Sequence, residues 1–139
     1  VEGSRLGIMG FCMGGRASYQ MAALRSDLRA AVDLYGGDTR QGFGDGPAPF
    51  DLTAKITCPI LILDGDQDQH PSPDEVRLIA AELERHGKVH EVHIYPGVGH
   101  AFMSAQGPRR RAEVVDDAWE RLLGWFERYL VHEPALARG

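Results

Sequence analysis

Short apolar runs alternate with amphipathic stretches along this chain. The runs predict buried strands at Leu6–Met9, Ala30–Tyr35, Pro59–Leu63 and His90–Tyr95. The third run reads Ile-Leu-Ile-Leu after its proline, which is typical of a parallel strand covered on both faces. Gly36-Gly37 and Pro96-Gly97 follow two of the runs and indicate turns at the strand ends.

Apolar residues at helical spacing predict helices after the first, third and fourth of these runs. The first predicted helix spans Gly14–Leu24. The second opens at Pro73 or Asp74, runs through His86 and stops at Gly87, and the third spans Ala112–Val131. The expected buried faces are Ala17, Met21 and Leu24 in the first, Val76, Ile79, Ala80 and Leu83 in the second, and Val115, Trp119, Leu122, Leu123, Phe126 and Leu130 in the third.

This order of elements predicts an α/β fold in which a parallel sheet of about four strands is flanked by helices. We expect one domain over residues 1–139. The segment from Asp38 to Lys55 contains several Gly and Pro residues and is predicted to be a loop. In such sheets the chemistry gathers at the carboxyl ends of the strands, so the residues that follow each strand are the candidates for a functional site.

Composition narrows the class of protein and its partners. The chain has 139 residues with 15 Lys and Arg against 20 Asp and Glu, and its net charge of −5 does not favour nucleic acid or an anionic membrane. No apolar stretch approaches the ~20 residues of a membrane span. Cys12 and Cys58 form no Cys-x-x-Cys pair, which indicates free thiols, and we predict the cytoplasm. We expect no signal peptide, and a start at Val1 is expected of a processed or excised piece.

The most informative motif is Gly10-Phe11-Cys12-Met13-Gly14-Gly15, between the first strand and the first helix. A reactive side chain between glycines at such a turn is the nucleophile elbow pattern Gly-x-Ser-x-Gly, here with cysteine. A Cβ two residues before or after Cys12 is expected to collide with neighbouring atoms. The helix N-terminus and a nearby imidazolium are expected to lower the pKa of the thiol. The alternative is a small buried cysteine with no chemical role.

Carboxylates follow the third strand and a histidine follows the fourth. Asp64, Asp66 and Asp68 precede His100 in the chain, so nucleophile, acid and histidine occur in the order found in α/β hydrolases. Asp64 could instead cap the turn, and Asp66 could brace the loop through backbone amides. His70 either lines the pocket or lies in a solvated loop.

A calcium loop is the competing interpretation of the same segment. Asp64, Asp66, Asp68 and Glu75 have the spacing of its ligands. Gln69 stands where that loop needs glycine for its sharp turn, and a strand precedes the segment in place of a helix. We therefore expect no bound metal.

Three stretches resemble the dienelactone hydrolase family of α/β hydrolases: GIMGFCMGG at Gly7–Gly15, PILILDGDQD at Pro59–Asp68 and YPGVGHAF at Tyr95–Phe102. The resemblance implies a nucleophile at Cys12, an acid at Asp68 and a base at His100. It also implies hydrolysis of a small carboxylic ester or lactone through a thioester acyl-enzyme, without a cofactor.

Two further sets of site residues accompany this triad. The backbone N–H of Met13, at the N-terminus of the predicted helix, is expected to bind the oxyanion. We expect Phe11, Tyr35 and Phe102 to line the substrate pocket.

The resemblance covers the later two-thirds of a family member. In the family the fold begins with several strands and a helix ahead of the elbow strand, and we expect a partial α/β-hydrolase fold here, with those N-terminal strands absent. They normally carry the second oxyanion donor. We expect an unseen segment, another chain or a homodimer to complete the sheet, because an uncovered elbow strand would be a hydrophobic edge.

Several alternatives remain open at this point. The chain could be an inactive fragment or a non-catalytic protein of this fold, or a peptidase-type α/β hydrolase. Phe43 and Phe50 could line an acyl pocket or pin the loop to the core. Arg109–Arg111 could attract an anionic substrate or form a solvated turn, while Met103-Ser104 replaces the arginine with which the family binds a substrate carboxylate.

Overall fold

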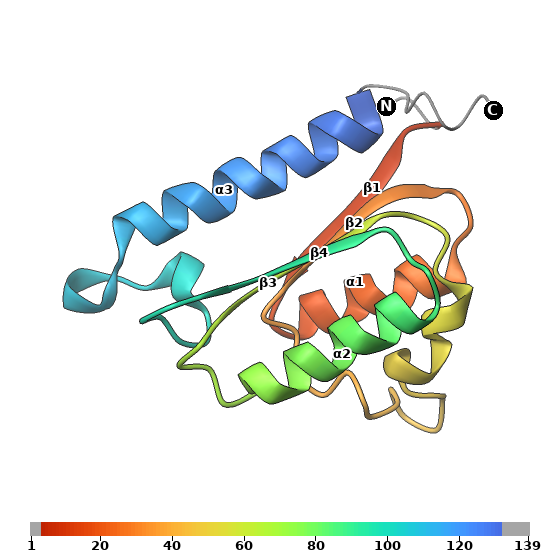
Figure 1. Cartoon of the computed structure of the whole chain (residues 1–139), viewed down its shortest axis with the longest axis horizontal. Coiled ribbons are helices and arrows are strands. Elements are labelled where there is room, and N and C mark those ends of the chain that lie inside the picture. Colours follow the sequence, from red (N-terminus) through yellow and green to blue (C-terminus); the bar gives the residue numbers. More distant parts are fainter. Residues whose placement is uncertain (1–3, 132–139) are drawn as a thin grey trace.

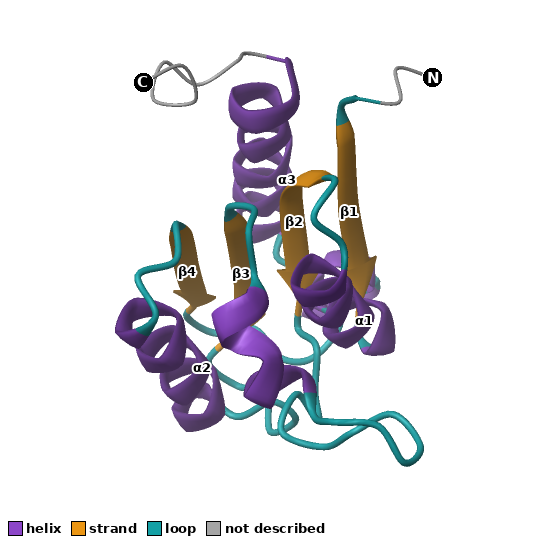
Figure 2. Ribbon diagram, turned by 90° about the vertical axis from the view of Figure 1, so that its right-hand side faces the viewer, coloured by secondary structure: helices purple, strands orange, loops and turns teal. Residues whose placement is uncertain are grey.

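Parallel strands form the central layer of the molecule in the computed structural model, which describes residues 4–131. They are β1 (Leu6–Phe11), β2 (Leu28–Leu34), β3 (Ile60–Gly65) and β4 (His90–Tyr95), side by side in that order (Figure 2). Every neighbouring pair is parallel, so the carboxyl ends of the strands meet at one edge of the sheet. The predicted α/β class and strand number are confirmed.

Helices cover both faces of this sheet (Figure 1). α1 (Met13–Leu24) and α2 (Pro73–Arg85) pack on one face, and α3 (Ala112–Phe126) crosses the other. A π-helical turn, Glu127–Val131, continues α3. Ser72 caps the start of α2, and its hydroxyl accepts the Glu75 amide at 3.2 Å. The helix ends before Gly87, whose φ of 66° suits glycine.

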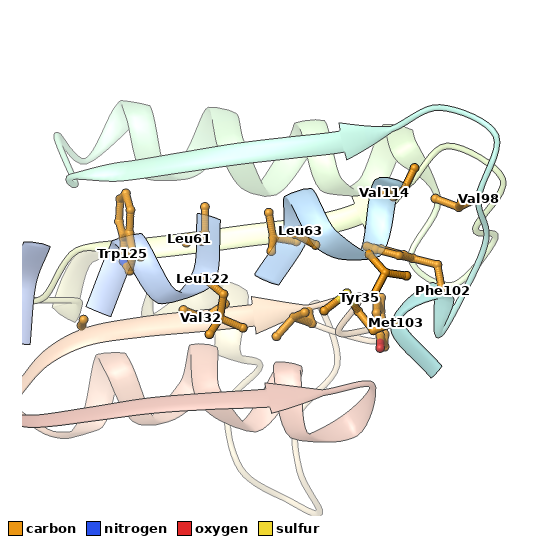
Figure 3. Packing of buried hydrophobic residues seen from close by; sticks show 14 of the residues in the cluster. Val32, Tyr35, Leu61, Leu63, Val98, Phe102, Met103, Val114, Leu122 and Trp125 are labelled. Carbon is orange, nitrogen blue, oxygen red and sulfur yellow. The ribbon is translucent and has the colours of Figure 1, made fainter. Parts of the chain in front are cut away.

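Side chains alternate along the strands and divide the core in two. One set packs under α3 (Figure 3) and includes Val32, Leu34, Leu61 and Leu63. The other set packs under α1 and α2 and includes Ala31, Ile60 and Ile62. β2 and β3 are buried on both faces, as expected for central parallel strands.

The buried faces of two helices differ in part from those predicted. In α1 the buried residues are Gly15, Ser18, Tyr19, Ala22 and Ala23, whereas the predicted Leu24 is 54% exposed. The small residues let α1 approach the sheet closely, a requirement that a hydrophobic pattern does not express.

In α3 the buried residues are Val114, Val115, Ala118, Leu122 and Trp125. The predicted Val115 and Leu122 are confirmed, and Phe126 and Leu130 pack against the same core, whereas the predicted Trp119 and Leu123 are 39% and 61% exposed. Trp119 lies beside Phe11 at the end of β1, with ring centroids 6.4 Å apart, so α3 carries a second apolar side. The face predicted for α2 is confirmed at Val76, Ile79 and Leu83.

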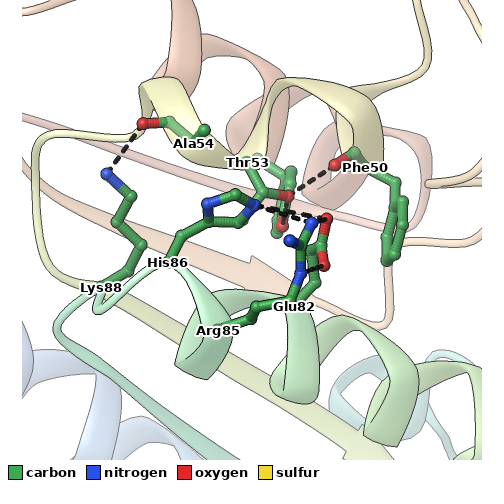
Figure 4. Close-up of polar contacts among 8 residues, drawn as sticks. Phe50, Thr53, Ala54, Glu82, Arg85, His86 and Lys88 are labelled. Carbon is green, nitrogen blue, oxygen red and sulfur yellow. Dashed lines mark hydrogen bonds and ion pairs between the residues drawn. The ribbon is translucent and has the colours of Figure 1, made fainter.

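The predicted loop between Asp38 and Lys55 ends in a short 3₁₀ helix, η1 (Pro49–Lys55). Thr53 Oγ1 lies 2.5 Å from the Tyr19 hydroxyl of α1 and donates to the Phe50 carbonyl at 2.6 Å. Lys88 Nζ donates to the Ala54 carbonyl at 2.9 Å (Figure 4). The prediction of a continuous loop is wrong because a proline at the first helical position starts a helix as readily as it marks a turn.

Candidate active site

The backbone at Cys12 is strained and fastened to the neighbouring strand. Cys12 stands between β1 and α1 with φ 56° and ψ −123°, a conformation that costs a non-glycine residue on the order of 1–3 kcal/mol. Its amide donates to the Leu34 carbonyl at 3.0 Å, and its own carbonyl accepts the Gly15 and Arg16 amides at 2.9 and 3.2 Å. These bonds hold the side chain at the edge where the strands end.

Two of the motif's glycines are required by close packing, and one is not. A Cβ on Gly10 would overlap the Gly14 carbonyl, and a Cβ on Gly15 would meet an Asp33 carboxylate oxygen and the Leu34 carbonyl. A Cβ on Gly14 would meet nothing within 4 Å. The expectation of a collision two residues after Cys12 is therefore wrong, because the tight approach occurs at Gly15.

Asp68 and His100 come together from the loops that follow β3 and β4. His100 Nδ1 lies 2.9 Å from Asp68 Oδ2. The other oxygen, Asp68 Oδ1, accepts the His70 amide at 2.8 Å, and the Asp68 side chain is 1% exposed. With Nδ1–H donating to the carboxylate, Nε2 of a neutral imidazole is left as the acceptor.

A cleft of about 230 Å³ contains Cys12 together with His100. The other residues that line it are Met13, Arg16, Gly37, Asp38 and His70. Because α1 begins at Met13, the amide of that residue has no intrahelical carbonyl to bond. The structure therefore gathers Cys12, Met13 and His100 in one cleft, with Asp68 behind His100.

His70 belongs to the wall of this cleft and also to the solvent. Its Nε2 lies 2.7 Å from Asp38 Oδ1, and its side chain is 65% exposed. The hydrogen bond and charge of Asp38 raise the pKa of the imidazole above its usual value. His70 therefore both lines the cleft and is exposed to solvent, so each of its two interpretations holds in part. Its pair with Asp38 is a feature that sequence spacing did not indicate.

The thiol of Cys12 has a raised pKa. Burial is the larger cause and the negative charge of Asp68 the second. The prediction of a lowered pKa is therefore wrong, since the helix N-terminus does not outweigh desolvation beside a carboxylate. Cys12 is a thiol at neutral pH, and a base is needed to make it a nucleophile.

An aromatic cluster supports His100. The Tyr35 ring meets the His100 ring edge-on at 5.4 Å, and Phe102 meets Tyr35 at the same distance. Phe11 lies 6.1 Å from Tyr35. Tyr35 is 1% exposed and Phe11 is 39% exposed, so Tyr35 packs against His100 from the core. Contact of these residues with a substrate stays a prediction.

A second, larger groove begins at His100 and runs along the segment between β4 and α3. Its volume is about 720 Å³, and its lining includes Phe102, Arg109 and Arg111. Arg111 pairs with Glu113 at 2.7 Å. Arg109 and Arg111 therefore line a groove that shares His100 with the cleft.

Phe43 and Phe50 occupy different surroundings. The Arg16 guanidinium stacks on Phe43, 3.7 Å from the ring centroid, and donates to the Gln41 and Gly42 carbonyls at 2.6 and 2.9 Å. Phe50 packs against the core under α1 and α2. Phe50 therefore pins the segment to the core, while Phe43 is held near the cleft through Arg16.

Sequence reasoning missed the buried carboxyl of Asp33 in β2. Asp33 is 1% exposed, and its Oδ1 accepts the Gly36 amide at 3.0 Å. Burial raises its pKa to about 7. A single acid inside the apolar run Ala31-Val32-Asp33-Leu34 was the available signal.

Residues 4–131 contain no group of three or more His, Cys, Asp or Glu side chains arranged to hold a metal ion. Asp66, one of the carboxylates of the calcium-loop interpretation, accepts the Gly97 amide at 2.9 Å. Asp66 thus braces the loop through a backbone amide, as one alternative anticipated. None of the helices within the described range has the length and apolar character needed to cross a membrane.

The parallel sheet, the helices on both faces and the turn after β1 define an α/β hydrolase fold. A crystal structure from Klebsiella pneumoniae subsp. pneumoniae MGH 78578, provisionally named a dienelactone hydrolase, matches with a TM-score of 0.82 at 33% identity, over 91% of this chain and 53% of that one. The Pyrococcus horikoshii acylaminoacyl peptidase matches with a TM-score of 0.81 at 17% identity, over 97% of this chain and 26% of that one. The second likeness concerns the fold alone.

The chain belongs to the dienelactone hydrolase family, whose model matches residues 1–130. A protein of Escherichia coli (strain K12), provisionally named a carboxymethylenebutenolidase, is 36% identical over 126 residues, which are 90% of this chain and 46% of that protein. A Bradyrhizobium sp protein, provisionally named a 2-oxo-3-(5-oxofuran-2-ylidene)propanoate lactonase, is 33% identical over 133 residues, or 94% and 53%. The chain spans about half the length of these relatives.

Proposed function

We propose that this chain carries the reacting groups of a small-molecule carboxylic-ester or lactone hydrolase, with Cys12 as nucleophile, His100 as base and Asp68 as the orienting acid. The observation that carries the proposal is the 2.9 Å contact between Asp68 and His100 at the cleft that also contains Cys12. The family membership and the names of the relatives agree with this class of substrate.

Acylation begins with the Cys12 thiol. Nε2 of His100 accepts its proton as the sulfur attacks the ester carbonyl, and Asp68 stabilises the imidazolium that forms. The Met13 amide donates to the oxyanion, and such a donor typically contributes ~10²–10³ in rate. Collapse breaks the C–O bond, His100 protonates the leaving oxygen, and a thioester remains on Cys12.

Deacylation repeats these proton transfers with water. His100 removes a proton from a water molecule that attacks the thioester carbonyl, and the Met13 amide again stabilises the oxyanion. The C–S bond breaks, the proton on His100 returns to the sulfur, and the carboxylic acid leaves. The cycle consumes one water and needs no metal or redox cofactor.

A covering for the outer edge of β1 is part of the proposal. In the described sheet β1 bonds only to β2. Apolar side chains are exposed nearby: Phe11 at 39%, Met13 at 67% and Trp119 at 39%. An unpaired apolar strand is a site of association, so we expect further strands of the same protein, or a second copy, to pair with β1 and supply the second oxyanion donor.

The decisive test is covalent modification of the proposed nucleophile. The full-length protein that contains these residues is assayed with a small aryl ester, before and after iodoacetamide, and as Cys12→Ser, His100→Ala and Cys58→Ser. Loss of activity on alkylation of Cys12, with Cys58→Ser still active, supports the mechanism. Full esterase activity after complete alkylation of Cys12 would refute the mechanism.

Two companion measurements separate the other functions. Cleavage of peptide amides faster than esters would indicate the peptidase-type alternative. Residues 1–139 expressed alone should self-associate, whereas a well-folded and soluble monomer in size-exclusion chromatography would contradict the need for a covering of β1.

A further inference from the structure

Asp64 is a buried carboxyl that the proposed reaction does not use. It lies at the carboxyl end of β3, four residues before Asp68, and is 0% exposed. Neither of its carboxyl oxygens has a hydrogen-bond partner among residues 4–131. A buried polar group without a partner is costly, and an ionised one far more so.

The charges around Asp64 make ionisation still harder. Asp68 and Asp33 both act on it with negative charge, and the Tyr35 hydroxyl group also lies within its electrostatic reach. Burial, with Asp68 as the second cause, raises the pKa of Asp64 to about 9. The backbone of Gly65 opposes this rise only in part, as the Gly36 amide, which donates to the Asp33 carboxylate, does for Asp33. Asp64 therefore holds a proton at neutral pH, and Asp68 is the carboxylate with which it interacts most strongly.

Asp68 has room for such a donor. Its Oδ2 receives His100 Nδ1 and its Oδ1 receives the His70 amide. Each carboxylate oxygen has two lone pairs, so the group accepts about four hydrogen bonds. Two donors leave a nearly fully buried carboxylate under-satisfied, since Asp68 is 3% exposed.

We propose that Asp64 is a positioning residue: a neutral carboxylic acid that donates its proton in a hydrogen bond to Asp68, the carboxylate that orients His100. This inference rests on the proposed function for its kinetic consequence. The donated bond fixes the rotamer of Asp68 and draws charge from its oxygens, so Asp68 holds His100 in place without pulling too strongly on the Nδ1 proton. His100 Nε2 then stays an acceptor for the Cys12 proton.

The protonation of Asp64 is tested first, by infrared difference spectroscopy of the full-length protein at pH 8. The carbonyl stretch of a protonated carboxylic acid should be present in wild type and lost in Asp64→Asn. Asp33→Asn is the matched control, because most of the Asp33 carboxyl is already ionised at pH 8 in wild type. If Asp64→Asn loses no carbonyl band relative to wild type, the proposal is overturned, whether or not the protein hydrolyses esters.

The positioning role is tested by ester kinetics against pH. Asp64→Ala removes the donor and should lower kcat/KM roughly tenfold at pH 7, the fold-change for one hydrogen bond to a charged group. Its acidic limb should also move to higher pH, because Asp68 then pulls harder on His100. Asp64→Asn supplies a neutral N–H donor and should restore both rate and limb.

The kinetic outcomes separate a positioning role from a packing role. A loss in Asp64→Ala without movement of the acidic limb, or no rescue by Asn, would overturn the proposal. Asp74→Asn, at an exposed position on α2, controls for loss of a carboxylate. If Asp64→Ala does not fold, the kinetics of Asp64→Asn and the infrared band still test the proposal. An inactive wild type would refute the proposed function and leave the band as the test of the proton.

Discussion

The amide of Cys12 donates to the carbonyl of Leu34 at 3.0 Å and ties the turn after β1 to the last residue of β2. The bond spans two parallel strands and fixes a residue whose φ is 56°. Strain of this kind persists only where the surroundings over-determine the backbone. The glycines on either side are part of those surroundings.

Gly10→Ala and Gly15→Ala are expected to destabilise the protein by about 1–3 kcal/mol each, the usual range for overpacking. In both cases the added Cβ would meet backbone atoms, of Gly14 and of Leu34 respectively. Thermal unfolding measures the effect. Gly14→Ala is the matched control, because nothing lies within 4 Å of its Cβ position. A Gly14→Ala variant as unstable as Gly10→Ala would contradict this account.

Alkylation of Cys12 by iodoacetamide should be slow at neutral pH and accelerate as the pH rises. Burial and the charge of Asp68 raise the pKa of this thiol, so little thiolate is present to react. Mass spectrometry of the labelled peptide gives the rate against pH. Asp68→Asn removes the second cause and should speed labelling at a given pH. Labelling of Cys12 faster than free cysteine at neutral pH would refute the raised pKa.

The buried acids of β2 and β3 should give stability that falls as pH rises. Asp33 and Asp64 have pKa values raised from 3.8 to about 7 and about 9. Above pH 4 the unfolded chain releases these protons while the folded protein keeps them, so the free energy of unfolding decreases by about 1 kcal/mol per pH unit for each group. The loss from Asp33 ends near pH 7 and that from Asp64 near pH 9.

Denaturant unfolding is measured for wild type, Asp33→Asn and Asp64→Asn between pH 4 and pH 9. The contribution of each acid is the difference between wild type and variant in the slope of the free energy of unfolding against pH. The difference for Asp33→Asn should disappear above pH 7, while that for Asp64→Asn should continue toward pH 9. Parallel curves for wild type and Asp64→Asn would show that Asp64 is ionised in the folded protein, contrary to expectation.

Asp38→Asn should lower the pKa of His70 toward its ordinary value. The hydrogen bond that His70 Nε2 donates to Asp38 Oδ1, 2.7 Å away, is the largest cause of the raised pKa, and the charge of Asp38 is the second. A titration of the imidazole C–H resonances by NMR measures the change, with His93 as the internal reference on β4. An unmoved His70 resonance would mean that the pair with Asp38 does not form in solution.

Much of this molecule could be predicted from local pattern. The apolar runs are long enough to mark each strand, and β4 has the bounds expected of it. The α2 face follows helical spacing because α2 buries a single apolar stripe. The Cys12 and His100 candidates follow from where they stand relative to strand ends, since parallel strands bring those ends together, while the resemblance to the family singled out Asp68 among the three carboxylates that follow β3.

The faces of α1 and α3 could not be predicted in the same way. Gly15 and Ala22 are buried because α1 must approach the sheet closely, and Trp119 is exposed because α3 has apolar side chains on two sides. Burial of a helix residue depends on which surface its neighbours occupy, and hydrophobicity at one position does not contain that information.

The sequence by itself therefore determined the parallel α/β order, the turn at Cys12 and the candidate triad, because strand, helix and glycine signals are local. Only the tertiary structure decided which glycine is needed, which way the thiol pKa moves and that the Asp64 carboxyl is buried. Each of these depends on distances between atoms far apart in the chain and on how much water lies between them. Desolvation and close packing are properties of the assembled fold, and they have no counterpart in a linear pattern.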